Sequence, residues 1–185
     1  MKRIQFLLML LFASVILFSS CGKDDPEVEN EEEVITTLNY TLTSSNGEVV
    51  ILSFVDLDGD GGESPVITGG TLMADSRYTG TIELLNATES PAENVTEEIE
   101  EEAEEHQFFF SSSLSGVTVD YEDRDADGNP IGLISTLNVG SAGTGTLTIV
   151  LRHEPMKDAE GVSDGDISNA DGETDIEVTF PIDVQ

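Results

Sequence analysis

The chain has 185 residues and a formal net charge of −31, from 38 acidic and 7 basic side chains. This charge excludes nucleic-acid binding, because a polyanion would be repelled and the Lys and Arg needed for counterion release are scarce. It also disfavours adsorption to anionic lipid headgroups, so the partners that remain are metal cations or a basic patch on another protein.

The first twenty residues have the three-part layout of a secretory signal. Lys2 and Arg3 follow Met1, an apolar run extends from Ile4 to Phe18, and small residues precede Cys21. The apolar run is too short for a comfortable membrane span, which needs about 20 residues. Residues 1–20 are therefore predicted to be a cleaved signal peptide.

Cys21 is the chain's only cysteine, so an internal disulfide is excluded. The segment Leu17–Cys21 resembles the lipobox of bacterial lipoproteins, in which the cysteine is lipidated and the signal is cut directly before it. Phe18 stands where that pattern has an aliphatic residue. We expect a lipid on Cys21, rather than a free thiol, to anchor the protein to a membrane.

Residues 21–33 are predicted to be an acidic, extended tether, because Val28 is the only apolar residue behind Cys21 and the carboxylates repel one another. Lys23, Asp24 and Asp25 resemble the export signal that sends lipoproteins of the Bacteroidota to the outside of the outer membrane. A generic solvated linker is the alternative, and the residues leave both open.

From residue 34 onward, short runs of β-forming residues are separated by Gly, Asn and Asp. Ser45–Gly47 is typical of a hairpin turn. This pattern predicts an all-β fold for residues 34–185, an immunoglobulin-like antiparallel β-sandwich of about eight strands in a single domain. The predicted strands are Val34–Thr43, Glu48–Val55, Tyr78–Leu85, His106–Phe110, Val117–Tyr121, Leu133–Val139, Thr146–His153 and Asp175–Val184.

One segment breaks the strand pattern. Residues 97–105 are rich in Glu, which favours helix, and carboxylates early in a helix suit its positive end. Only Val95, Ile99 and Ala103 can face a core. We expect one short, acidic, marginal helix inserted at the edge of the sandwich.

Two loops read D-x-D-x-D-G, the opening half of an EF-hand calcium loop, in which alternate carboxylates converge on one ion. The closing Glu is missing, since Ile67 and Ile134 occupy the twelfth positions. Asp and Gly also simply favour turns, so calcium binding and plain turns both remain. The candidate calcium ligands are Asp56, Asp58, Asp60, Asp123, Asp125 and Asp127.

The only two histidines suggest a site for zinc or another transition metal. Glu102 and His106 share one helix face at i, i+4, and His153 ends a strand beside Glu154. The competing interpretations are a helix C-terminal cation for His106 and an ordinary strand-end residue for His153. A haem site lacks an attachment motif. The candidate ligands are Glu102, Glu105, His106, His153 and Glu154.

Motifs of hydrolases, zinc proteases and nucleotide-binding enzymes are absent from the sequence, so we expect a protein that is not an enzyme. With Cys21 and the tether, several stretches resemble a family of short, uncharacterised flavobacterial lipoproteins, some of which are labelled "type 1 periplasmic binding fold". The chain is too short and too rich in strand patterns for that two-lobed fold. The stretches are Glu31–Thr36, Asp56–Leu72, Pro91–Phe109, Leu151–Pro155 and Gly172–Phe180.

The resemblance implies a lipid-anchored protein of the outer membrane, facing the exterior or the periplasm, beside a TonB-dependent outer-membrane receptor. Two functional hypotheses follow. The first is a non-enzymatic binding module that captures a metal cation for uptake. The second is an adhesion or scaffold module that calcium merely stiffens.

Overall fold

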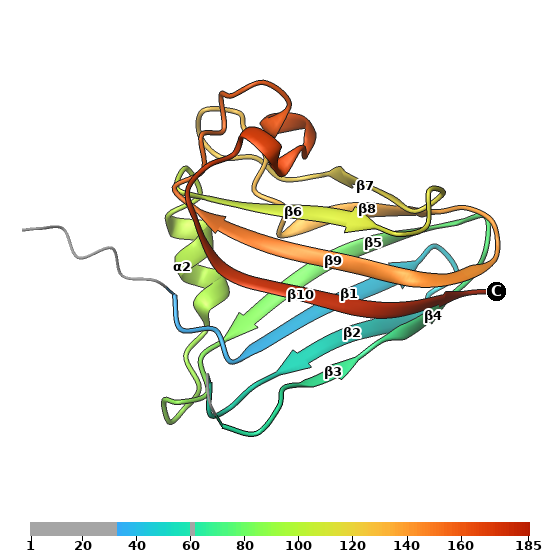
Figure 1. The fold of residues 1–185 in the computed structure, drawn as a ribbon, viewed down its shortest axis with the longest axis horizontal. Helices are drawn as coiled ribbons and strands as arrows, with labels where there is room; N and C mark the ends of the chain where they lie inside the picture. Colours follow the sequence, from blue (N-terminus) through green and yellow to red (C-terminus); the bar gives the residue numbers. More distant parts are fainter. Residues whose placement is uncertain (1–32, 60–61) are drawn as a thin grey trace, which may run out of the picture. The chain divides into compact units, whose positions relative to one another are not determined.

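A computed structural model describes residues 33–59 and 62–185, which form two facing β-sheets and one short helix (Figure 1). The first sheet has the order β3-β2-β1-β5-β8-β7 and the second the order β4-β10-β9-β6. Strands of the first sheet are β1 (Thr37–Ser44), β2 (Val49–Val55), β3 (Val66–Thr68), β5 (Ser76–Leu85), β7 (Thr118–Tyr121) and β8 (Ile134–Val139). Strands of the second are β4 (Gly70–Leu72), β6 (His106–Ser112), β9 (Gly143–His153) and β10 (Glu173–Val184).

The predicted all-β sandwich is confirmed, with ten described strands instead of about eight. All eight predicted strands are present within a few residues of their expected ends. The two additional strands, β3 and β4, have three residues each. Neighbouring strands pair antiparallel except β4 and β10, which pair in parallel.

Alternation of side chains builds the core. Leu38, Tyr40 and Leu42 of β1 are fully buried, while the residues between them are partly exposed. In β10 the even-numbered residues from Ile176 to Val184 are buried in the same way. Because a strand turns successive side chains to opposite faces, each sheet gives one apolar face to the shared core.

The helix α2 (Val95–Glu101) covers one end of the sandwich (Figure 1). Its predicted apolar stripe is confirmed, since Val95 and Ile99 are buried and Ala103, just past the helix end, is 8% exposed. Two short 3₁₀ turns, η1 (Val162–Asp164) and η2 (Ile167–Asn169), lie between β9 and β10.

Several predictions lie outside the described residues. They are the signal peptide of residues 1–20, Cys21 with its lipid, and the tether up to residue 32. Among residues 33–59 and 62–185, no helix is long and apolar enough to cross a bilayer.

Candidate metal centre

His106 and His153 lie opposite each other in the antiparallel register of β6 and β9. Their imidazole rings stack with centroids 4.7 Å apart and planes 21° apart. His106 is 0% exposed and His153 is 7% exposed. Strand pairing therefore brings together the two histidines that the sequence indicated as candidate ligands without predicting that they are close in space.

The surroundings of His106 determine which of its two ring nitrogens carries no proton. The helix ends at Glu101 and His106 begins β6 as predicted, so Glu102 and His106 do not share a helix face as expected. The Nδ1 of His106 lies 3.1 Å from the Glu102 carbonyl oxygen. A carbonyl can only accept, so Nδ1 carries the proton. Burial lowers the pKa of His106 and outweighs the opposing effect of this hydrogen bond. The ring is therefore neutral, and Nε2 keeps a free lone pair.

This Nε2 is buried and has no hydrogen-bond partner, and the same is true of Nδ1 of His153. Both atoms belong to side chains that are at least nine-tenths buried. A buried polar atom left without a partner costs about 1–3 kcal/mol. Two buried nitrogens without hydrogen-bond partners therefore lie on neighbouring rings, which makes these rings the candidate site.

Asp175 is the third member of the buried group, and sequence reasoning missed it. Its carboxylate oxygen Oδ2 lies 3.9 Å from His106 Nε2, and neither side chain is exposed to solvent. The register of β10 against β9 shifts between Thr174 and Ile176, so Asp175 is the extra residue of a β-bulge. Bulges re-aim side chains and occur often beside functional sites.

The Nε2 nitrogen of His153 lies near exposed carboxylates. Its Nε2 lies 3.8 Å from a carboxylate oxygen of Glu105, whose side chain is 57% exposed. Glu154 follows His153 with a left-handed backbone, φ 49°, and its N–H donates to the Glu105 carbonyl at 2.6 Å. Glu105, His153 and Glu154 place ligand atoms within 4.8 Å of one another.

All five predicted transition-metal candidates thus gather at the end of the sandwich that α2 covers. His106, His153 and Asp175 form one group of ligand atoms within 4.8 Å, and Glu33, Glu102 and His106 form another. Glu33 and Asp175 are the additional members. Sequence offered no signal for them, since each is one of many acidic residues.

Negative charge accumulates at this end. Burial raises the pKa of Glu33 from 4.5 to about 7, together with a hydrogen bond to Glu98. The negative charges of Glu98, Glu102 and Asp175 act in the same direction. A carboxyl group that resists ionisation beside other carboxylates indicates a place where a cation would be stabilised.

In the first Asp loop the carboxylates face their own backbone. Asp56 accepts a hydrogen bond from the Gly59 N–H at 3.0 Å, and Asp58 accepts one from Glu63 at 2.9 Å. Asp60 lies outside the described residues. These contacts are those of an acidic turn, and calcium binding at this loop stays a prediction.

In the second Asp loop an internal ammonium group forms an ion pair with Asp125, one of the three predicted calcium ligands. Lys157 is 5% exposed, and its Nζ donates to Asp125 at 2.9 Å and to the carbonyls of Ala103 and Pro130. Burial alone would raise the pKa of Asp125, but hydrogen bonds from Lys157 and the Asn129 N–H lower it below its usual value.

The carboxylates of Asp123 and Asp127, on either side of Asp125, lie in different surroundings. Asp123 accepts from the N–H groups of Gly132 and Ile134, and Asp127 is exposed. Within the described residues, no group of three metal-ligating side chains within 4.8 Å includes a member of either Asp loop. Calcium at the second loop also stays a prediction, and Lys157 competes with it.

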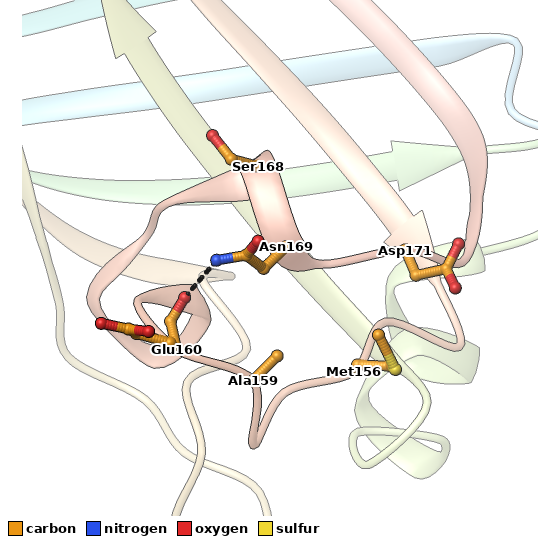
Figure 2. A pocket seen from close by; sticks show the side chains of 6 residues that line it. All are labelled: Met156, Ala159, Glu160, Ser168, Asn169 and Asp171. Atoms are coloured by element: carbon orange, nitrogen blue, oxygen red, sulfur yellow. Dashed lines mark hydrogen bonds between the residues drawn. The ribbon is translucent and has the colours of Figure 1, made fainter.

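Two open hollows lie near the 3₁₀ turns. One, of about 490 Å³, is shown in Figure 2, where the Asn169 amide donates to the Glu160 carbonyl oxygen at 2.8 Å. Its lining residues are Met156, Ala159, Glu160, Ser168, Asn169 and Asp171. The other, of about 510 Å³, borders Lys157. Most of the lining in Figure 2 is exposed, so we place the candidate site at the histidines instead.

Comparison with known proteins adds little. No family model matches the chain, and no curated protein matches it. Domains 4 and 5 of the S-layer protein SbsC are similar at 13% identity, over 85% of this chain and 74% of that one, with a TM-score of 0.31. A likeness this distant carries no argument about function, and the resemblance to flavobacterial lipoproteins stays a prediction.

Proposed function

We propose that this chain is a lipid-anchored, non-enzymatic binding lipoprotein that captures a divalent transition-metal cation between His106, His153 and Asp175. The observation that carries this proposal is the pair of buried imidazole nitrogens without hydrogen-bond partners beside a buried carboxylate. Two imidazoles and one carboxylate are a donor set that zinc and similar ions favour.

The distances support this donor set. A tetrahedral ion with bonds of about 2.0–2.2 Å holds its ligand atoms about 3.4 Å apart. The 3.9 Å between His106 Nε2 and Asp175 Oδ2 is too long for a hydrogen bond and about half an ångström wider than that separation. The ligand atoms of His106, His153 and Asp175 lie within 4.8 Å of one another, so coordination requires the stacked rings to turn and move inward until their nitrogens converge on the ion.

The hydrogen bond at the other ring nitrogen of His106 supports the proposal as well. Metal-binding histidines commonly donate their other N–H to a carbonyl, which fixes the tautomer and orients the ring. His106 does so through Glu102. The competing interpretation is a purely structural stack of neutral histidines, but that interpretation leaves the two buried nitrogens without partners.

The location is part of the same proposal. Lipidation of Cys21 would hold the domain at the outer membrane, and the resemblance to flavobacterial lipoproteins suggests a TonB-dependent receptor as a neighbour. The calcium-stiffened adhesion module remains the alternative. Its Asp loops lack a comparable group of converging ligands among the described residues.

Cobalt(II) titration of the purified full-length protein tests the proposal, because d–d absorption bands report coordination by imidazole. An excess of Mg²⁺ suppresses weak binding to the many exposed carboxylates. We expect one equivalent to bind. His106→Gln and Asp175→Asn should each weaken binding at least about tenfold.

Glu177→Gln is the matched control, since Glu177 lies two residues from Asp175 on β10 but is exposed. It should leave the bands and the affinity unchanged. Binding to the His106→Gln/His153→Gln double variant as tight as to the unaltered protein would contradict the proposal. Asp175→Asn keeps the side-chain shape, so it tests the site even if a histidine variant folds poorly.

A further inference from the structure

We infer that Glu105, Glu154 and Nε2 of His153 form an exposed entry subsite through which a divalent transition-metal ion reaches the buried group. This inference rests on the proposed function, because the ion must have a buried destination. It assigns a separate role to the two acidic residues, which the buried group of His106, His153 and Asp175 does not include.

The two ring nitrogens of His153 lie in different environments, one near an exposed carboxylate and the other buried. Nε2 lies 3.8 Å from the exposed carboxylate of Glu105, whereas Nδ1 is buried and has no hydrogen-bond partner. These nitrogens point away from each other across the ring. His153 therefore belongs both to the buried group and to the exposed group with Glu105 and Glu154.

The backbone holds the exposed group in place. Glu105 directly precedes β6 and Glu154 directly follows β9, so the pairing of these strands sets them side by side. The hydrogen bond from the Glu154 N–H to the Glu105 carbonyl closes the end of the ladder. The backbones of the two acidic residues are thus held beside His153, and their carboxylate oxygens lie within 4.8 Å of a nitrogen of its ring.

The degree of burial determines the order in which an incoming ion meets these side chains. Glu105 and Glu154 are exposed, His153 is 7% exposed, and the side chains of His106 and Asp175 are fully buried. A hydrated ion meets the two carboxylates first. Exchange of water for carboxylate oxygen there lowers the cost of removing the remaining water before the ion reaches the buried nitrogens.

The transfer exchanges one tautomer of His153 for the other, with water as the proton carrier. While Nε2 binds the ion, the ring proton sits on Nδ1. When the ion moves inward to Nδ1, Nδ1 releases its proton to water and Nε2 takes one proton from water, so the proton count balances. The Glu105 carboxylate can then accept a hydrogen bond from Nε2. No change of oxidation state occurs, so no redox partner is needed.

Stopped-flow mixing of Co²⁺ with the full-length protein tests the inference by following the d–d bands in time. Release is followed separately by adding a chelator to the loaded protein. An entry subsite lies on the path in both directions. Glu105→Gln/Glu154→Gln should therefore slow both uptake and release, each at least about tenfold.

The matched control is Glu101→Gln/Glu104→Gln, which removes the same charge from exposed neighbours. It should change both rates less than about twofold. Equal slowing in the control would mean general attraction and would overturn the inference. Faster release after Glu105→Gln/Glu154→Gln would also overturn it, because it would make these residues ligands of the final site. Absence of Co²⁺ bands in the unaltered protein would instead refute the proposed function.

Discussion

His106 and His153 are a directly opposed cross-strand pair, and their rings stack 4.7 Å apart inside the sandwich. Two imidazoles in this arrangement cannot both be protonated without strong repulsion at close range. Burial lowers the pKa of His106, so at least this ring is neutral, which is the state of imidazole that binds metal ions. The predictions below follow from this group and from the buried ion pair near it.

Metal binding should stabilise the fold. At a free Zn²⁺ concentration about 100 times the dissociation constant, the gain is about 2.7 kcal/mol, or about 5–10 °C in Tm for a chain of this size. Scanning calorimetry with Zn²⁺ and then with a chelator measures it. A Tm that Zn²⁺ raises equally in His106→Gln would show that the stabilising ion binds elsewhere.

The ion pair between Lys157 and Asp125 should be costly to break on one side. Lys157→Met leaves the Asp125 carboxylate, 1% exposed, without its partner, and should destabilise the fold by about 3–5 kcal/mol. Lys157→Met/Asp125→Asn should cost less than the sum of the two single changes. Urea unfolding of the four proteins measures the coupling, and strict additivity would contradict it.

Glu33 should make the metal-free protein less stable as the pH rises. Its pKa is about 7 in the folded chain against 4.5 as the reference for the unfolded chain, so the folded state holds the extra proton between these values. Stability should fall from pH 4.5 to pH 7 because of this group. Glu33→Gln should remove that fall, which urea midpoints at pH 4.5, 6 and 8 would measure.

Cys21 should decide where the protein resides. Cys21→Ala removes the acceptor of the lipid, so the uncut precursor should accumulate and the mature lipid-anchored form should disappear. Fractionation and intact mass measure both. A protein of normal mature size in the membrane fraction of the variant would contradict lipid anchoring.

The strands were predictable because their cores alternate, as β1 and β10 illustrate. The short strands β3 and β4 were missed because Gly69, which separates them, and Gly70, which begins β4, together suggest a turn. Such strands form because longer neighbours offer unpaired edges, and that is a tertiary effect.

The candidate site was only half predictable. The histidines and their adjacent carboxylates stood out by residue type, but their proximity depends on the register of β6 and β9, which local sequence does not determine. Asp175 was hidden because strict alternation with Ile176 and Val178 assigns it to the solvent face. The bulge reverses that assignment. Lys157 was hidden because lysines are rarely buried.

Lys157 is the only lysine in residues 33–185. Amine-directed reagents added to the folded domain therefore have a single side-chain target, and it is 5% exposed behind Asp125 and two carbonyls. The rate at which this one amine is labelled therefore measures how often this end of the sandwich opens.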